Sequence, residues 1–230
     1  MLPSFWVVIP AAGVGSRMRA DRPKQYLHLA GKTIIEHTLE CFIGHPSLLG
    51  LVVSLAADDS YWPSLDCASD KRIARADGGT ERGDSVLAGL RRLAELGAAD
   101  DAWVLVHDAA RPNLARTDLD SLLVQLADDA VGGLLAVPAR DTLKRAGSDG
   151  RIQETVDRTV IWQAFTPQMF RLGVLRDALA AALEAGAAIT DEASALEWAG
   201  LSPRLIEGRS DNLKITRPED LLWLERRWKS

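Results

Sequence analysis

The chain repeats one pattern along its length: a short, continuously apolar segment is followed by a longer segment with helical periodicity. Apolar segments lie at residues 6–9, 51–55, 103–106 and 133–137, and residues 86–97 show a helical pattern between two of them. A continuous apolar run of this length is typical of a strand that is covered on both faces. Strands that alternate with helices form parallel βαβ units. The sequence therefore predicts an α/β fold with a mostly parallel sheet and helices on both faces.

Composition limits the classes of function. Hydrophobic residues make up 47% and charged residues 26% of the 230 residues, a balance typical of a globular chain rather than a disordered one. The net charge of −5 argues against general binding of nucleic acid, which needs a basic face. The length alone fits one large domain or two small ones. Because no repeat or linker is visible, we expect a single domain over residues 1–230.

The cysteines and the N-terminal segment bear on the compartment. The spacing of Cys41 and Cys67 matches neither a metal site nor a disulfide scaffold. The N-terminal segment has no basic region, and the apolar stretch at residues 5–12 is too short to span a bilayer. We therefore expect a cytoplasmic protein that does not bind a membrane.

One segment, residues 139–161, breaks the alternation of strands and helices. Its centre, Gly147-Ser148-Asp149-Gly150, is a strong turn signal between two polar segments of alternating character. We predict a two-stranded arm that projects from the domain. An isolated hairpin is marginally stable in water, so we expect the arm to pack against a second subunit of a homodimer.

The loop that follows the first predicted strand contains Gly13 and Gly15, with Arg17 and Lys24 further along. Glycines allow a backbone to approach a ligand closely, and successive N–H groups in such a loop can bind an anion. The third glycine of a dinucleotide-binding fingerprint is replaced by Met18, and the G-K-[ST] ending of a P-loop is absent. Taken alone, the glycines leave phosphate binding and a plain turn equally open.

Two further strands also end in polar residues. Gly79 and Ser85 follow the strand at residues 73–76 and lie where a helix begins, which suits a base edge, a phosphate or simple capping. Asp108 follows the strand at residues 103–106 at a position that suits Mg²⁺, which prefers few carboxylates plus substrate phosphates. An N-cap or turn role for Asp108 is the alternative. Ligands of parallel sheets bind beyond the carboxyl ends of the strands, so we expect these residues to share one site.

These motifs, in this order, resemble the 2-C-methyl-D-erythritol 4-phosphate cytidylyltransferases of the non-mevalonate isoprenoid pathway. The matching segments cover residues 7–221 without a sizeable gap: PAAGVGSRM, PKQY, DGGTERGDSVLAGL, VLVHDAARP, TVDR, TPQ, ITDEASALE and EGRSDNLKITRPEDL. The combination is far more specific than any single motif. The resemblance implies a Rossmann-like nucleotidyltransferase fold with a protruding arm, a homodimer, and Mg²⁺ or another divalent cation as cofactor.

The resemblance also implies roles for individual residues. Arg17 and Lys24 are implied to contact the CTP phosphates, and Asp108 to lie at the Mg²⁺ and phosphate centre. Asp211 and Lys214 are implied to complete the catalytic group. The residues implied to surround the nucleotide are Ala11, Ala12, Gly13, Gly15, Gly79 and Ser85. Those implied for methylerythritol phosphate are Arg111, Thr142, Arg158, Thr166 and Thr190, with Arg158 supplied across the dimer.

The expected reaction needs no general base. The nucleophile is a phosphate oxygen of the acceptor, and with a second pKa near ~6 it is largely ionised at neutral pH. Catalysis should therefore consist of positioning and electrostatic stabilisation. We expect Lys24 and Lys214 to stabilise the α-phosphate, while Arg17 and Mg²⁺ hold the departing pyrophosphate.

Three alternatives remain at the level of sequence. A ribitol phosphate cytidylyltransferase would share the nucleotide half and differ at the acceptor site. A NAD-linked oxidoreductase lacks support, because the third glycine and the acidic ribose-binding residue are missing. A non-catalytic nucleotide-binding protein on the same fold is the third, since a fold does not determine a function.

Overall fold

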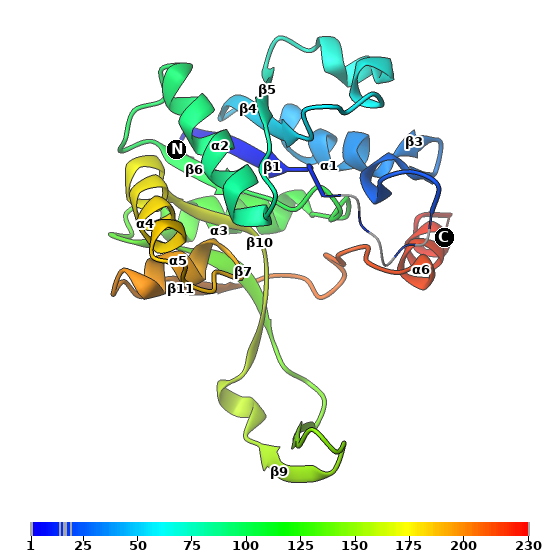
Figure 1. Cartoon of the computed structure of the whole chain (residues 1–230), viewed down its shortest axis with the longest axis vertical. Coiled ribbons are helices and arrows are strands. Elements are labelled where there is room, and N and C mark those ends of the chain that lie inside the picture. The colour runs from blue at the N-terminus through cyan, green and yellow to red at the C-terminus, as the bar shows by residue number, and fades with distance from the viewer. Residues whose placement is uncertain (1, 14, 16–17, 19, 230) are drawn as a thin grey trace.

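The computed structural model describes residues 2–13, 15, 18 and 20–229. Its centre is a seven-stranded sheet with strand order β11-β7-β10-β6-β1-β4-β5 (Figure 1). Neighbouring strands are parallel except at β10, which runs antiparallel to both β6 and β7. The strands are β1 (Phe5–Pro10), β4 (Leu48–Leu55), β5 (Ile73–Asp77), β6 (Trp103–Val106), β7 (Gly132–Pro138), β10 (Trp162–Arg171) and β11 (Arg204–Glu207).

Helices cover both faces of this sheet, as the alternating pattern predicted. The apolar residues of α1 and α3 join one core cluster, and those of α2, α4 and α5 join the other. The α-helices are α1 (Ile34–Ile43), α2 (Arg82–Glu95), α3 (Arg116–Leu126), α4 (Leu172–Glu184), α5 (Glu192–Trp198) and α6 (Pro218–Lys229). Further elements outside the main sheet are short: the strands β2 (His28–Leu29) and β3 (Lys32–Thr33), and the 3-10 helices η2 (Lys24–Tyr26), η3 (Trp62–Ser64), η4 (Asp66–Ser69) and η5 (Arg158–Val160).

Strand β1 shows why its sequence is apolar at every central position. Val7 and Ile9 lie in the core cluster under α1 and α3, whereas Val8 lies in the cluster under α2 and α4. Successive side chains of a strand point to opposite faces, so a strand covered on both sides needs apolar residues at consecutive positions. The same alternation sorts Leu105 and Val106 of β6 into the two clusters.

Strand β10 was not predicted from the sequence. It lies in the middle of the sheet, and its pairing with β7 is irregular between Ala164 and Gln168. Pro167 falls within this break. Proline cannot donate to a ladder and argues against a central strand, so the sequence pattern did not indicate this element, although Met169 and Phe170 beyond the break are fully buried.

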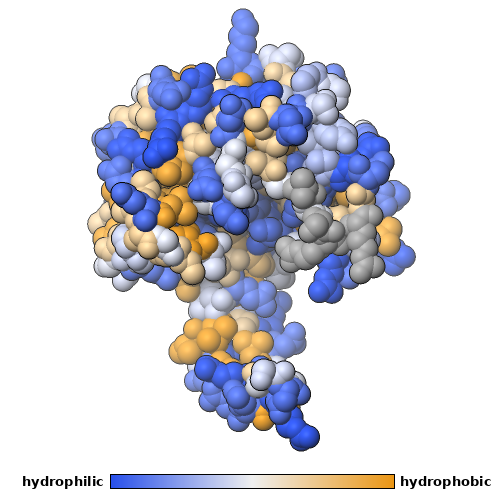
Figure 2. Space-filling view, in the orientation of Figure 1, coloured by the Kyte–Doolittle hydropathy of each residue, from blue (hydrophilic) through white to orange (hydrophobic). Residues whose placement is uncertain are grey.

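The arm predicted at residues 139–161 is present. Strands β8 (Leu143–Ala146) and β9 (Ile152–Val156) pair antiparallel and project away from the main sheet (Figure 1). Hydrophobic residues gather on its surface (Figure 2), where Ile152 is 66% and Val160 73% exposed. Apolar side chains exposed to this degree on a projecting element are typical of a surface that another chain covers.

The C-terminal helix α6 packs beside β2 and the start of α1. Leu224 and Ile215 join Leu29 and Ile34 in a third apolar cluster. The Trp228 indole donates to the side-chain oxygen of Asn113 at 2.8 Å. This packing fixes the segment that carries Lys214. Along the part of the chain that the structure describes, no helix has the length and apolarity needed to cross a membrane.

Candidate active site

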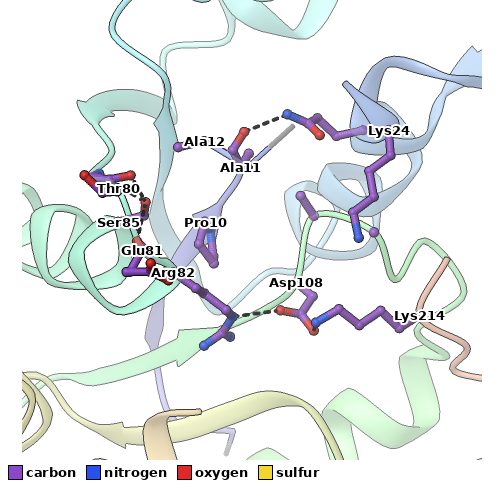
Figure 3. Close-up of a pocket in the computed structure, with 15 residues that line it drawn as sticks. Pro10, Ala11, Ala12, Lys24, Thr80, Glu81, Arg82, Ser85, Asp108 and Lys214 are labelled. Atoms are coloured by element: carbon purple, nitrogen blue, oxygen red, sulfur yellow. Dashed lines mark hydrogen bonds and ion pairs between the residues drawn. The ribbon is translucent and has the colours of Figure 1, made fainter. Parts of the chain in front are cut away.

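A cavity of about 170 Å³ opens at the carboxyl ends of β1, β5 and β6 (Figure 3). Strand β1 contributes its following loop, β5 contributes the turn into α2, and β6 contributes the segment that begins at Asp108. Lys24 and Lys214 enter from two other segments. The lining residues are Pro10, Ala11, Ala12, Gly13, Lys24, Gln25, Gly79, Thr80, Glu81, Arg82, Ser85, Asp108, Ala109, Ala110 and Lys214.

Two glycines allow the turn after β5 to form the cavity wall. A Cβ on Gly78 would lie 2.5 Å from the Cβ of Ala12, and a Cβ on Gly79 would lie 2.2 Å from that of Asp84. Both distances are too short for any side chain. The Gly79 N–H donates to the Ser85 hydroxyl at 3.2 Å, so this turn is attached to the first turn of α2.

Gly15 and Lys24 are in close contact. Gly15 has a φ of +67°, and a Cβ there would lie 2.7 Å from Cγ of Lys24. The Lys24 amine donates to the Ile215 carbonyl at 3.1 Å, and the side chain of the next residue, Gln25, donates to the Ala11 carbonyl at 2.7 Å. The glycine therefore leaves room for the Lys24 stem, and the lysine lies against the segment that carries Lys214.

Asp108 is the carboxylate at the centre of three cations. Its Oδ1 lies 3.1 Å from Nε of Arg82, and its Oδ2 lies 2.9 Å from Nζ of Lys214 and 3.3 Å from Nε of Arg111. Burial alone would raise the pKa of Asp108, but the charges of Arg82, Lys214 and Arg111 outweigh it and hold that pKa well below the usual range. Asp108 is therefore a permanent anion, and its three partners form a dense group of positive charge.

A second cavity, of about 200 Å³, is also lined by Asp108. It shares Arg82, Asp108 and Lys214 with the first. Its lining residues are Arg82, Asp108, Arg111, Ala164, Phe165, Thr166, Gln168, Thr190, Asp191 and Lys214. The two cavities therefore meet at one charged group.

Arg111 is fixed in the wall of this second cavity. It donates to the Asn212 carbonyl at 2.7 Å, and its guanidinium carbon lies 4.7 Å from the centre of the Phe165 ring. Burial lowers the pKa of Arg111, an effect that Asp108 partly offsets. The guanidinium is thus a buried cation held in one orientation.

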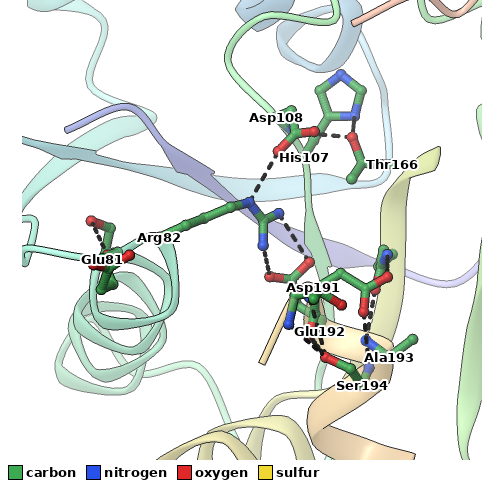
Figure 4. Close-up of polar contacts among 12 residues, drawn as sticks. Glu81, Arg82, His107, Asp108, Thr166, Asp191, Glu192, Ala193 and Ser194 are labelled. Carbon is green, nitrogen blue, oxygen red and sulfur yellow. Dashed lines mark hydrogen bonds and ion pairs between the residues drawn. The ribbon is translucent and has the colours of Figure 1, made fainter. Parts of the chain in front are cut away.

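His107 orients the Thr166 side chain (Figure 4). Its Nε2 lies 3.0 Å from the Arg111 carbonyl, which can only accept, so Nε2 carries the proton. Nδ1 then accepts from the Thr166 hydroxyl at 3.0 Å, and the Thr166 oxygen accepts from the Asp108 N–H at 3.1 Å. Burial lowers the pKa of His107 to about 4. In this arrangement the Thr166 hydroxyl can accept a hydrogen bond from a ligand in the cavity but cannot donate one, because its proton is hydrogen-bonded to His107.

Most of the residues singled out in the sequence line one of the two cavities. The first cavity contains Ala11, Ala12, Gly13, Lys24, Gly79, Ser85, Asp108 and Lys214; the second contains Arg111, Thr166 and Thr190 and again Asp108 and Lys214. Gly15 supports the Lys24 stem instead of lining a cavity. Arg17 lies outside the described residues.

Three of the singled-out residues lie elsewhere. Thr142 and Arg158 are exposed on the arm, where Arg158 donates to the Arg140 carbonyl. Asp211 lines a separate cavity near the base of the arm, and its carboxylate is bound by Arg209 and Arg227. Within this one chain, the structure therefore does not bring these three residues to Asp108.

The site also contains two residues that the sequence did not reveal as functional. Arg82 lies within the DGGTERGD motif, and Glu192 within ITDEASALE. Their guanidinium and carboxylate form two hydrogen bonds, of 2.6 and 3.1 Å (Figure 4). Since 110 positions separate the two residues, no local spacing signals the pair.

The described residues include no group of three or more His, Cys, Asp or Glu side chains that could hold a metal ion. Asp108 is a single hard carboxylate in the wall of both cavities. This donor set suits a cation such as Mg²⁺ that takes most of its ligands from substrate phosphates and water. It does not suit a structural zinc ion, which takes four protein ligands.

Comparison with known proteins gives one consistent family. The family model described as 2-C-methyl-D-erythritol 4-phosphate cytidylyltransferase matches residues 5–227. The protein of that name from Pseudomonas fluorescens strain SBW25 is 73% identical over 227 residues, which cover 99% of this chain and 97% of that protein. The one from Pseudomonas aeruginosa strain UCBPP-PA14 is 73% identical over 225 residues, covering 98% and 96%.

Comparison with solved structures gives the same family. The crystal structure of the Francisella tularensis protein of the same name is similar with a TM-score of 0.83 at 36% identity, over 99% of this chain and all of that one. A crystal structure of a 4-diphosphocytidyl-2C-methyl-D-erythritol synthase gives a TM-score of 0.84 at 40% identity, covering 97% and 98%. The expected nucleotidyltransferase fold is therefore confirmed, and the chain belongs to the 2-C-methyl-D-erythritol 4-phosphate cytidylyltransferase family.

Proposed function

We propose that the chain transfers the cytidylyl group of CTP to the phosphate of 2-C-methyl-D-erythritol 4-phosphate and releases pyrophosphate. The observation that carries this proposal is the pair of cavities that share Arg82, Asp108 and Lys214. A transfer between two anionic substrates needs two adjoining sites with positive charge where they meet. The names of the relatives support this acceptor over ribitol phosphate, and they support an enzyme over a non-catalytic binding protein.

The first cavity is the proposed nucleotide site. Its glycine-containing walls leave backbone N–H groups near the ligand, and Gly79 and Ser85 lie where a base edge would be read. Lys24 lies near the phosphate end. Arg17 completes the phosphate contacts in this proposal, on the strength of its motif alone.

The second cavity is the proposed acceptor site. Arg111 is a fixed guanidinium that suits a two-oxygen contact with the acceptor phosphate. The Thr166 oxygen presents a lone pair, so a hydroxyl of the sugar alcohol, which can donate, suits it better than a phosphate oxygen. Thr190 lies at the edge of the same cavity.

The mechanism requires only that the substrates are positioned and their charge is balanced. The acceptor phosphate oxygen, largely ionised at neutral pH because its pKa is near ~6, attacks the α-phosphorus of CTP, and the bond to the pyrophosphate oxygen breaks. Negative charge grows on the oxygens of the α-phosphate and on the leaving group. Lys24 and Lys214 stabilise that charge. Asp108 would hold Mg²⁺ together with the phosphates, and the cation would neutralise part of their charge.

The arm extends the proposal to a homodimer, with residues 1–230 as one nucleotidyltransferase domain and residues 139–161 as the dimerisation arm. Thr142 and Arg158 are polar groups suited to a phosphate, yet they lie on an arm that projects away from the central sheet (Figure 1) and line neither cavity. The exposed Ile152 and Val160 on the same arm favour contact with a second copy. We assign Thr142 and Arg158 to the acceptor site of that second copy.

Asp211 fits an indirect role in this scheme. Its carboxylate binds Arg209 and Arg227, and its carbonyl accepts from the Asn113 side chain at 2.8 Å. These contacts support a role for Asp211 in holding the segment that leads to Lys214.

The proposal also places the reaction in the cytoplasm, supported by the free state of Cys41 and Cys67.

The test of the function is pyrophosphate release by the purified protein with Mg²⁺. CTP, UTP, ATP and GTP are each paired with methylerythritol phosphate and with ribitol phosphate. Release only with CTP and methylerythritol phosphate is the expected result. Release with ribitol phosphate would reassign the acceptor site, and release with no pair would contradict the proposal.

A further inference from the structure

The ion pair of Arg82 and Glu192 lies where the two cavities meet. Arg82 is the first residue of α2 and lines both cavities. Its two terminal nitrogens face Glu192 at 2.6 and 3.1 Å, while its Nε faces Asp108 at 3.1 Å. One guanidinium therefore connects Glu192 to the central carboxylate of the site (Figure 4).

Glu192 is buried at the start of a helix that is hydrogen-bonded to the central sheet. It is the first residue of α5, and its side chain is 2% exposed. The Gln168 side chain on β10 ties this helix to the sheet, because it accepts from the Ala193 N–H at 2.8 Å and donates to Asp191 at 2.9 Å. The position of Glu192 is thus set by the central sheet.

The cations around Asp108 differ in how firmly they are held. Lys214 contacts Asp108 through one flexible amine, and its side chain is 36% exposed. Arg82 is held on its far edge by both oxygens of Glu192. A metal ion at Asp108 would compete with these cations for the carboxylate, and a phosphate would compete with Asp108 for the cations. In either case Lys214 can move away, whereas the Arg82 guanidinium stays bound to Glu192.

From this arrangement we infer that Glu192 is a positioning residue of the reaction: it fixes the Arg82 guanidinium at the junction of the two cavities, where Arg82 acts as a stationary cation for the reacting phosphates. The inference rests on the proposed function and names a residue pair for that same site.

A purely structural ion pair would behave differently. A buried ion pair adds little net stability relative to apolar residues, although removal of one partner leaves an uncompensated charge. If the pair served stability alone, its loss would lower the melting temperature and leave turnover of the folded enzyme unchanged. If Glu192 acts through Arg82, the two residues affect turnover as a unit.

A double-mutant cycle in pyrophosphate release tests the inference with Arg82→Lys, Glu192→Gln and the double variant. Lysine keeps the positive charge, but its single amine cannot replace the separate guanidinium nitrogens that contact Glu192 and Asp108. We expect each single variant to lose about tenfold or more in kcat, with the KM for CTP within about threefold because the other residues that line the nucleotide cavity are unchanged. The double variant should be no slower than Arg82→Lys alone.

Glu197→Gln is the matched control, because Glu197 is an exposed glutamate on the same helix; its kcat should equal that of the wild type. Melting temperatures are measured for every variant. Multiplicative losses in the double variant, or an unchanged kcat with a lowered melting temperature, would overturn the inference. If Glu192→Gln does not fold, Glu192→Asp keeps the charge, and its shorter side chain should still lower kcat.

The wild-type enzyme separates this outcome from failure of the proposed function. An inactive wild type overturns the function and the inference with it. An active wild type with an unaffected Glu192→Gln variant overturns the inference alone.

Discussion

The side-chain amine of Lys214 lies 2.9 Å from Oδ2 of Asp108, and both residues line the proposed nucleotide site and the proposed acceptor site. Asp108 follows the buried strand β6, whereas Lys214 lies in the segment before α6. The contact thus joins the carboxyl edge of the sheet to the C-terminal segment. It also holds the lysine close to the position where the transferred phosphate would lie.

Replacing Lys214 with Gln should lower kcat by about 100-fold or more, because a cation that stabilises transition-state charge is lost. Lys71→Gln, at an exposed turn, is the matched control and should keep full activity. Pyrophosphate release under saturating CTP and acceptor is the measurement. An unchanged kcat in the Lys214 variant would remove it from the mechanism.

Replacing Asp108 with Asn should reduce both activity and stability. The carboxylate is the counter-charge of the buried Arg111 and of Arg82. Removing one partner of a buried ionic group costs about 3 kcal/mol, so the free energy of unfolding in urea should fall by that order. Asp101→Asn, exposed before β6, should change neither quantity. A variant as stable as the wild type would show that Asp108 is not needed as the counter-charge of the three cations.

Gly15→Ala should impair catalysis through Lys24. Both Gly15 and Gly31 have positive φ, at +67° and +91°, but only at Gly15 would a Cβ meet Lys24, at 2.7 Å; at Gly31 it meets no atom within 4 Å. Either alanine should cost about 1–2 kcal/mol of stability from the left-handed backbone. Only Gly15→Ala should also lower kcat. Equal kcat values for the two variants would contradict the role given to this contact.

The arm makes a prediction about mixed dimers. Arg158→Ala and Lys214→Gln should each be almost inactive. If Arg158 serves the partner's site, a heterodimer of the two has one site with both residues intact. Random mixing after unfolding and refolding should therefore restore about a quarter of wild-type activity. A mixture no more active than its components would indicate that each arm serves its own chain.

Buried His45 should make the protein less stable in mild acid. Its Nδ1 accepts from the Ser47 N–H and its Nε2 faces Asp120. Burial lowers the pKa of His45 from its ordinary value of 6.5, an effect that Asp120 only partly offsets. The unfolded chain then binds a proton at a higher pH than the folded protein does. The stability contributed by neutral His45 is present above pH 6.5 and is lost as the pH falls below it.

Urea unfolding of the wild type and of His45→Asn at about pH 8 and about pH 5.5 tests this sign. The drop in unfolding free energy between the two pH values should be smaller in the variant. His28→Asn, at an exposed position, should show the wild-type drop. An equal drop in all three proteins would mean that His45 does not contribute to the pH dependence.

The local features of the fold could be predicted from the sequence because they depend on neighbouring residues. The apolar run at residues 6–9 became β1. The capping box of Thr33 and Glu36, which lie three positions apart, starts α1. Polar residues after the strands lie together because the carboxyl ends of parallel strands share an edge.

Features that depend on distant contacts could not be predicted in this way. Strand β10 was missed because Pro167 interrupts its pattern, although the strand pairs with both β6 and β7. Arg82 and Glu192 meet only because the fold brings the first residues of α2 and α5 together, 110 positions apart in the sequence. Asp211 and Lys214 are three positions apart in one loop, yet their charged groups face different partners.

In the proposed mechanism an acceptor phosphate oxygen attacks the α-phosphorus of CTP. Methylerythritol phosphate whose phosphate carries ¹⁸O, followed by mass spectrometry of both products, distinguishes this route from others. We expect a cytidine diphosphate ester that retains all of the label, including the oxygen that bridges its two phosphorus atoms, and pyrophosphate with none. Label in the pyrophosphate, or cleavage of CTP without formation of the labelled ester, would contradict this mechanism.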